Sequence, residues 1–364
     1  MLIKLSLFLS MLYNFIEKLK KIKIPFVPYF KIYIDLGSSV TKIAIKEKGI
    51  ILREPTYLAY DTKKDLITFI GKEAKEIVGK TPDFIKTINP VVSGVISDFD
   101  AEVALLNNFI QHSVGLYTKN NLIKPIIEAL TAVPTVATEI EQKAVKEAIL
   151  KTDVSQVYLV EKILATAYGC GIDIFSPHPS LIIEIGGGLT EIAVVGSGNI
   201  IRQKTLKIAG NYFKKVIGHY LYLKHNIILG ENTCEELKNN LLEFDKTDKT
   251  QTIRGKSLET GLPKSLRVKG SEIKEALLPH FNQIIDCTKE VIESCPPEVI
   301  DEIFKKGIIL TGGLAQLKGL DKFFAKELQI DVFISPNPQE ATINGLIELD
   351  KKDKKILKNL LIFI

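Results

Sequence analysis

Apolar and polar residues follow their clearest pattern at residues 181 to 201, which read LIIEIGGGLTEIAVVGSGNII. Three apolar residues lead to Glu184, three glycines follow, and a second run rich in β-branched residues begins at Thr190. Val, Ile and Thr favour the pleated surface of a sheet, and Gly permits tight turns. The pattern therefore predicts a strand, a tight turn and a returning strand.

The residue types of this hairpin suit a phosphate or a metal ion. Backbone N–H groups of Gly186, Gly187 and Gly188 can approach an anion closely. Glu184, at the end of a buried strand, can hold a hydrated Mg²⁺. A plain Gly-rich hairpin without a ligand explains these residues equally well.

A second copy of the pattern favours the ligand-binding interpretation over the plain hairpin. Residues 32 to 51 read IYIDLGSSVTKIAIKEKGII, and placing Asp35 on Glu184 aligns Gly37 with Gly186 and Thr41 with Thr190 at a constant offset of 149 residues (184 − 35). Two hairpins in register indicate two similar domains that face each other across a shared polyphosphate.

Strands and helices alternate through the rest of the first half. We predict short strands over 32–70, a short helix in GKEAKEIVG, a loop at 89–94 and a helix over 98–113 with Asp98 near its cap. A strand at 125–133 then precedes a helix over 139–152, which Thr138 and Glu141 begin as a capping box. A strand at 156–160 and a helix at 162–171 complete an α/β pattern with partly parallel sheets.

The second half continues with helices over 211–224, from Gly230 onward, and over 271–293. Residues 243–272 are polar, and we expect a small surface subdomain poor in strands. The stretch Gly307-Ile308-Ile309-Leu310-Thr311-Gly312-Gly313 is a buried strand that ends in a glycine turn, a third place where backbone can meet a nucleotide. The basic, apolar tail KKDKKILKNLLIFI is expected to dock on the body, with a second membrane contact as the alternative.

Composition and charge narrow the class of protein. A chain of 364 residues with 46% apolar and 25% charged residues suits two folded α/β domains. Six Lys and one Glu lie in residues 1–31, so the remaining chain carries 42 basic and 42 acidic residues and is not a general nucleic-acid binder. Cys170, Cys234, Cys287 and Cys295 lack metal-ligand spacing and are expected to be reduced thiols.

The basic arm, residues 1–30, reads MLIKLSLFLSMLYNFIEKLKKIKIPFVPYF. Its polar residues recur close to helical spacing, which predicts an amphipathic helix that Pro25 ends. A secretory signal is disfavoured because no small-residue cleavage site follows, and Glu17 interrupts the apolar run too early for a spanning helix. We expect the apolar face to bind a membrane surface; packing on the protein or a partner is the alternative. The membrane-facing residues would be Leu5, Phe8, Leu12 and Phe15.

From residue 32 onward the chain resembles the actin superfamily and, within it, the MreB family of bacterial shape-determining actins. The matching segments occur in the family's order and spacing: IDLGSSVT (34–41), GIILREPT (49–56), IGKEAKEIVGKTP (70–82), SGVISDF (93–99), AVPTVATEIEQKAVKEA (132–148), EIGGGLTEIAVV (184–195), LGENTCEELK (229–238), TGLPK (260–264) and KGIILTGGLAQLKGLDKFFA (306–325).

The resemblance implies an α/β, actin-like ATPase fold with two ribonuclease-H-like domains flanking a nucleotide cleft. The first domain would span residues 31–178, with a small subdomain at about 60–110. The second would span 179–338, with a small subdomain at about 225–275. Residues 339–364 would return to the first domain and form the tail.

The resemblance also implies ATP or ADP with Mg²⁺ in the cleft. Asp35 and Glu184 would orient Mg²⁺ through water, and Glu161, Lys162, Leu189 and Thr190 occupy the positions of the family's hydrolytic groups. The residues expected to contact the nucleotide are Asp35, Gly37, Ser38, Ser39, Val40, Thr41, Gly186, Gly187, Gly188, Glu231, Cys234, Glu235, Lys238, Gly312, Gly313, Leu314 and Ala315. Leu122 and Ile123 lie where the family carries a membrane-inserting loop, although ordinary strand-edge residues are an alternative.

Departures from the family pattern at four positions bear on hydrolysis. Lys162 falls where the family has its water-positioning glutamate, with Glu161 beside it. In the second hairpin, Glu184 replaces the usual Asp and Leu189 replaces the usual first Thr. Leu314 replaces the third Gly of the later glycine turn. A charged Lys cannot accept a proton from water. We therefore expect nucleotide binding to persist and hydrolysis to be slow or absent.

The expected function is an ATP-binding filament protein on the inner face of the plasma membrane that takes part in cell-shape determination. Its expected partners are further copies of itself, membrane lipid, and wall-elongation membrane proteins or an active paralogue. A cytomotive or accessory filament that positions organelles or DNA is the main alternative. A sugar-kinase-type phosphotransferase lacks an obvious catalytic Asp here, and a chaperone-type ATPase would need a further substrate-binding domain.

Overall fold

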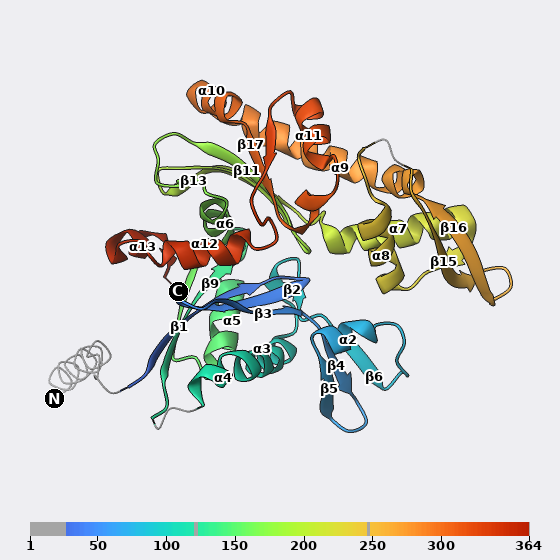
Figure 1. Ribbon diagram of the computed structural model, residues 1–364, viewed down its shortest axis with the longest axis horizontal. Helices are drawn as coiled ribbons and strands as arrows, with labels where there is room; N and C mark the ends of the chain where they lie inside the picture. The colour runs from blue at the N-terminus through green and yellow to red at the C-terminus, as the bar shows by residue number, and fades with distance from the viewer. Residues whose placement is uncertain (1–26, 120–122, 246–247, 364) are drawn as a thin grey trace, which may run out of the picture.

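The structure, a computed structural model, describes residues 27–119, 123–245 and 248–363. Two large sheets form its two halves (Figure 1). The first sheet has the order β19-β10-β9-β1-β2-β3. Its strands are β1 (Tyr29–Leu36), β2 (Val40–Ile45), β3 (Gly49–Pro55), β9 (Ile126–Val133), β10 (Gln156–Glu161) and β19 (Leu361–Ile362).

The second sheet has the order β13-β12-β11-β17-β18. Its strands are β11 (Ser180–Ile185), β12 (Thr190–Gly196), β13 (Asn199–Leu206), β17 (Ile308–Thr311) and β18 (Val332–Ile334). In each sheet an antiparallel three-stranded meander is extended on its first strand by two parallel strands: β9 and β10 in one case, β17 and β18 in the other. The sequence repeat is therefore also a repeat of topology, and the predicted α/β architecture is confirmed.

Helices cover the outer faces of both sheets and also lie between them (Figure 1). The first sheet carries α3 (Phe99–Ser113), α4 (Gly115–Thr118) and α5 (Glu139–Leu150), and the second carries α9 (Gly270–Glu293), α10 (Pro297–Lys306) and α11 (Leu320–Leu328). The predicted caps are confirmed: the Asp98 carboxylate accepts from the Ala101 N–H, and Thr138 with Glu141 forms a capping box. These caps satisfy helix N–H groups that have no partner within the helix.

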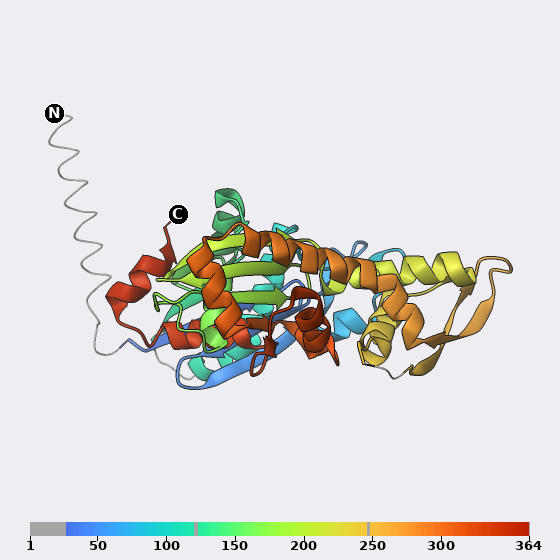
Figure 2. The same cartoon turned by 90° about the horizontal axis from the view of Figure 1, so that it is seen from above.

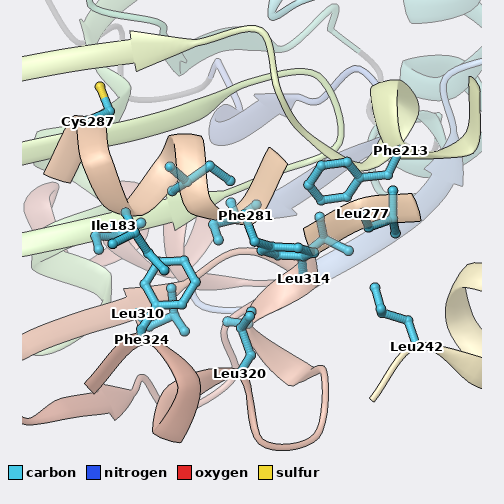
Figure 3. Packing of buried hydrophobic residues seen from close by; sticks show 14 of the residues in the cluster. Ile183, Phe213, Leu242, Leu277, Phe281, Cys287, Leu310, Leu314, Leu320 and Phe324 are labelled. Carbon is cyan, nitrogen blue, oxygen red and sulfur yellow. The ribbon is translucent and has the colours of Figure 1, made fainter. Parts of the chain in front are cut away.

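The second half has a large apolar core between α9 and the sheet. Phe281 and Leu277 of α9 pack against Phe213, while Ile183 and Leu310 line the sheet side of this core (Figure 3). Each such buried side chain contributes roughly 1.5–3 kcal/mol. Figure 2 shows α9 running along the second sheet toward the hairpin of β15 (Thr250–Ser257) and β16 (Pro263–Lys269).

The two halves meet at the crossing of α6 (Lys162–Gly169) and α12 (Ala341–Leu349). A Cβ atom on Gly169 would lie 1.9 Å from the Ala341 carbonyl oxygen, and one on Gly345 would lie 1.7 Å from that of Ala165. Only glycine fits at these two positions, so the two helix backbones lie in direct contact. A third core cluster, with members on β1, β9, α6, β11 and α12, fills the space between the sheets.

Each half carries a smaller appendage. In the first half it contains β4 (Leu58–Asp61), β5 (Leu66–Ile70), α2 (Lys72–Glu76) and β6 (Ile85–Ile88). In the second half it contains α7 (Gly210–His225), β14 (Ile227–Ile228), α8 (Glu231–Leu241), β15 (Thr250–Ser257) and β16 (Pro263–Lys269).

The prediction that residues 243–272 are poor in strands is wrong. β15 and β16 pair antiparallel over seven positions. On β15 the buried residues are Ile253 and Ser257, so small and polar side chains on the inner face concealed the alternation. The predicted loop at 89–94 likewise contains β7 (Val91–Val92), which pairs with β8 (Val95–Ile96).

The C-terminal tail docks on the first half, as expected by default. It forms α13 (Lys354–Leu360), after which β19 pairs antiparallel with β10 at the edge of the first sheet. Across the described ranges, none of the helices combines the length and apolar character needed to cross a bilayer.

Candidate functional site

The turns of the two hairpins lie against each other. A Cβ atom on Gly187 would lie 2.2 Å from the Ser39 hydroxyl oxygen, and one on Gly188 equally close to that of Ser38. Asn211, at the start of α7, donates to the Ser38 carbonyl oxygen at 3.3 Å. These glycines are therefore required by the approach of the facing hairpin, and backbone N–H groups of both turns gather at one place.

The first turn is closed by its own backbone and braced by a neighbouring loop. A Cβ atom on Gly37 would lie 2.4 Å from the Val40 carbonyl oxygen. The Ser38 hydroxyl accepts from the Gly94 N–H at 2.8 Å. Gly94 also lies beside Leu189 of the second hairpin, which is buried. Leu189 thus packs between the halves rather than offering a hydroxyl to a ligand.

The two equivalent threonines are structural. Thr41 and Thr190 are fully buried. The Thr190 hydroxyl donates to the Ile208 carbonyl oxygen at 2.5 Å, and the Thr41 hydroxyl lies 3.0 Å from that of Thr56. Because these hydroxyl groups already have partners inside the protein, neither is free to position a water molecule.

The acid of the first hairpin is held by a lysine of the same hairpin. Asp35 on β1 and Lys42 on β2 are cross-strand neighbours. The Lys42 ammonium lies 2.8 Å from Asp35 Oδ2, and both side chains are largely buried, with 14% and 6% of their surface exposed. The pair is an ion pair shielded from solvent screening.

The acid of the second hairpin is held by a lysine from another element. Lys162, the first residue of α6, places its ammonium 2.6 Å from Glu184 Oε1 and 3.8 Å from Glu191 Oε2. The Thr166 hydroxyl, one turn further along α6, donates to Glu184 Oε2 at 3.1 Å. Burial by itself would lower the pKa of Lys162, but Glu184, Glu191 and Asp35 outweigh it and raise the pKa. Lys162 is a fixed cation.

Two further carboxylates, those of Glu191 and Glu161, lie in this region. Burial raises the pKa of Glu191 to about 7, against the opposing effect of Lys162, and Glu191 Oε2 has no hydrogen-bond partner among the described residues. Burial also raises the pKa of Glu161, which stands at the N-cap of α6 without making a side-chain cap. The predicted catalytic positions Glu161 and Lys162 therefore lie beside the second hairpin as adjacent residues with different environments.

The donor set around the hairpins does not fit a Mg²⁺ ion held by Asp35 and Glu184. Mg²⁺ prefers six oxygen ligands in a near-octahedral shell, several of them water. Here each of the two carboxylates already contacts a lysine ammonium within 2.8 Å. Among the residues that the structure describes, no cluster of three or more His, Cys, Asp or Glu side chains suits a metal ion.

Helix α8 brings Glu231, Glu235 and Lys238, which are expected to contact the nucleotide, to the same region. The Lys214 ammonium of α7 lies 2.5 Å from Glu231 Oε1 and 3.7 Å from Glu235 Oε2. Burial lowers the pKa of Lys238 to about 8, and its ammonium lies 3.5 Å from where a Cβ on Gly210 would be. Cys234, in contrast, packs in the apolar core, and burial raises its pKa to about 11.

Side chains of the two appendages touch across the molecule. Lys75 of α2 pairs with Glu235 Oε2 at 3.0 Å, and the Asn232 amide donates to the Lys75 carbonyl oxygen at 3.1 Å. The Tyr57 hydroxyl donates to Glu231 Oε1 at 3.2 Å. Glu231 and Glu235, expected to contact the nucleotide, thus also join the two halves.

The third glycine turn packs beneath the second hairpin. Gly312 has a φ of 88°, and a Cβ there would lie 2.4 Å from the Ile185 carbonyl oxygen. After Gly313, both Leu314 and Ala315 are buried in the core of the second half. Leu314 therefore fills the core at the position where the family has a glycine.

Sequence reasoning missed Lys42, Lys214, Tyr57, Lys75 and Asn211. The sequence did contain a signal for the contact of Lys42 with Asp35, because Lys42 lies seven residues after Asp35 across a predicted hairpin. Lys214, Tyr57 and Lys75 reach the site only through the packing of separate elements, which no local pattern records.

Most of the predicted membrane residues, namely Leu5, Phe8, Leu12, Phe15 and Leu122, lie outside the described residues. Ile123 is 49% exposed. Exposed apolar side chains lie at the same end of the first half, where Tyr29 and Ile126 are paired neighbours on β1 and β9. Leu116 of α4 is also exposed, at 58%.

Comparison with known proteins agrees with this geometry. The sequence model of the MreB/Mbl protein family matches residues 29–358. The cell shape-determining protein Mbl of Bacillus subtilis (strain 168) is 37% identical over 326 residues, which cover 88% of this chain and 96% of that protein. The cell shape-determining protein MreB of Escherichia coli (strain K12) is 32% identical over 320 residues, covering 86% and 90%.

Solved structures confirm the predicted actin-like fold. MreB5 of Spiroplasma citri bound to ADP superposes with a TM-score of 0.84 at 31% identity, over 91% of this chain and 98% of that one. A filament structure of MamK shares the fold alone, with a TM-score of 0.72 at 18% identity over 89% and 99%. The chain therefore belongs to the MreB/Mbl family of cell-shape-determining, actin-like proteins.

Proposed function

We propose that this chain binds ATP or ADP where its two hairpins meet and assembles with further copies of itself into filaments that serve cell-shape determination. The observation that carries the proposal is the meeting of two glycine turns from topologically equivalent sheets, with Lys214, Lys238 and Glu231 beside them. Backbone N–H groups from both turns can receive phosphate oxygens. Solved structures of MreB5 of Spiroplasma citri, bound to ADP and to AMPPNP, support the binding of a nucleotide.

Hydrolysis of the nucleotide is proposed to be slow or absent. Phosphoryl transfer to water needs an oriented water molecule and a group that positions it. The ammonium of Lys162 cannot accept a proton, and Leu189 and Thr190 offer no free hydroxyl. Glu161 remains as an acid beside the site, with its pKa raised by burial.

A phosphate-release assay on the purified chain with ATP and Mg²⁺ tests this. Turnover comparable to an ordinary filament ATPase would refute slow hydrolysis. Lys162→Glu is expected to raise phosphate release, because it restores a carboxylate in place of the ammonium. Lys204→Glu, an equivalent reversal at an exposed lysine of β13 that pairs with Glu290 of α9 instead of an acid of the turns, serves as control.

Membrane association is proposed for the end of the first half that carries the N-terminal arm. Support comes from the amphipathic pattern of residues 1–24 and from the exposed Leu116, Ile123 and Ile126 nearby. Apolar side chains beside lysines suit the headgroup region of an anionic bilayer. The proposed location is the inner face of the plasma membrane.

Sedimentation with anionic vesicles tests the arm directly. Deleting residues 1–24 is expected to release most of the protein from the vesicles, and Ile123→Asp to release a smaller part. Unchanged binding after both changes would refute the membrane proposal.

Electron microscopy of the protein with ATP on a lipid monolayer tests self-assembly. We expect membrane-bound filaments. Filaments that form in solution and do not bind the monolayer would favour a cytomotive or accessory filament. Filaments on the monolayer would favour a shape protein that works with wall-elongation membrane proteins or an active paralogue.

A further inference from the structure

We propose that this chain receives the nucleotide's polyphosphate without a bound Mg²⁺, because Lys42 and Lys162 stand at the two acids that would otherwise orient the metal. The inference rests on the proposed nucleotide function and concerns the same site. It starts from the poor fit between Mg²⁺ and a donor set in which both carboxylates already contact ammonium groups.

The two contacts arise independently. Lys42 reaches Asp35 across the β1–β2 ladder at 2.8 Å, and Lys162 reaches Glu184 from the start of α6 at 2.6 Å. Both acids are almost fully buried, at 4% and 6% exposure of the whole residue. A hydrated Mg²⁺ at the same carboxylate oxygens would compete with the ammonium, and a buried ammonium that leaves its carboxylate loses its counter-charge.

The charges balance in the same way as they would with the metal. Asp35 and Glu184 bring two negative charges to the turns, which by themselves would repel a polyphosphate. A Mg²⁺ ion would cancel these two charges; Lys42 and Lys162 cancel them instead. Each ammonium has three N–H donors, so one engaged with a carboxylate leaves others for phosphate oxygens.

The surroundings keep Lys162 in place. Lys162 has a second carboxylate, Glu191, within 3.8 Å, and its partner Glu184 is held by the Thr166 hydroxyl. On the other side, the Lys238 ammonium lies next to Gly210, whose N–H donates to the Gly186 carbonyl oxygen. Positive charge therefore approaches the turns from α6, β2 and α8, three separate elements.

The test compares ATP binding to the full chain with Mg²⁺ and with EDTA, by isothermal titration calorimetry. The expected dissociation constants differ by less than about threefold, which is under the 1.4 kcal/mol of a tenfold change. Binding that is at least about tenfold weaker in EDTA would overturn the inference while leaving the proposed nucleotide function standing. No ATP binding under either condition would overturn the proposed function itself, and this inference with it.

Lysine variants add a readout that does not depend on the wild-type chain. Lys42→Met is expected to weaken binding in EDTA by about tenfold and to make it Mg²⁺-dependent, because Asp35 is then free to hold the metal. Lys162→Met is expected to act in the same direction, with circular dichroism confirming that each variant is folded. Binding by Lys42→Met that stays independent of Mg²⁺ would overturn the role given to Lys42.

Lys46→Met is the matched control. Lys46 directly follows the same strand, β2, and also pairs with a carboxylate, Asp350, at 3.2 Å. It stands at the far end of the strand from the turn, so its loss is expected to leave binding unchanged in both EDTA and Mg²⁺. A Mg²⁺ dependence in this variant equal to that of Lys42→Met would show a general charge effect and overturn the assignment.

Discussion

The two hairpins share a topology and an acid at the same place, but they neutralise that acid in different ways. Asp35 is held by Lys42, its cross-strand neighbour within the hairpin. Glu184 is held by Lys162, which comes from a helix between the two sheets and also faces Glu191. The first pair is local and needs only its own hairpin. The second pair forms only when α6 packs between the sheets, so the neutralisation of Glu184 depends on the assembly of the two halves.

The largest expected loss of stability comes from Lys162→Met, and its size would distinguish the second ion pair from the first. Lys162→Met leaves two buried carboxylates without a counter-charge, and it is expected to lower the free energy of unfolding by about 3–5 kcal/mol. Urea unfolding at about pH 8 measures it. The loss should shrink toward about pH 5, because Glu191, with a pKa raised to about 7, takes up a proton. A loss below about 1 kcal/mol, as expected for the exposed pair of Lys204 and Glu290, would remove the distinction between the hairpins.

Glu102 sharpens the comparison because it is a buried acid that no lysine neutralises. It is fully buried on α3, and neither carboxylate oxygen has a hydrogen-bond partner among the described residues. Burial raises its pKa from 4.5 to about 8. The folded state therefore holds a proton that the unfolded state releases, and stability falls as pH rises through this interval.

Glu102→Gln is expected to raise the free energy of unfolding by about 2 kcal/mol at about pH 8, and by little near pH 5. Urea unfolding across this pH range measures the difference. Asp100→Asn, at an exposed position in the first turn of the same helix, should instead cost a few tenths of a kcal/mol through the helix dipole. A Glu102→Gln effect that does not depend on pH would contradict the assignment.

The local pair is expected to matter less for stability. Lys42→Met leaves one buried carboxylate, that of Asp35, without its partner, whereas Lys162→Met leaves two. We expect a loss of about 1–2 kcal/mol in urea unfolding at neutral pH. A loss equal to that of Lys162→Met would mean that both acids depend on the assembled halves, and that the local and long-range pairs are energetically alike.

The smallest effect concerns the contact between the appendages. Lys75 and Glu235 are about a quarter exposed, so Lys75→Met is expected to cost less than about 1 kcal/mol in unfolding. Because this pair joins α2 to α8, limited proteolysis of the variant should nevertheless cut the appendages faster. Unchanged proteolysis would show that the pair does not hold the halves together.

Much of the fold could be predicted from the sequence because its signals are local. Alternation and glycine turns predicted both hairpins, and their constant offset predicted two similar halves. Side-chain caps predicted the starts of α3 and α5. The hairpin of β15 and β16 was missed, because its inner face carries Ser257 and Gly255 beside Ile253 and so lacks an apolar alternation.

Within the site, the sequence by itself determined the backbone turns, both acids and the presence of a lysine where a glutamate was expected. Only the tertiary structure decided what that lysine does. In a poorly polarisable interior a charge is weakly screened and interacts most strongly with the charges nearest to it, so its effect depends on which carboxylates the fold brings near it. Lys162 and Glu184 lie 22 positions apart in the chain, and their contact exists because α6 packs against β11 and β12.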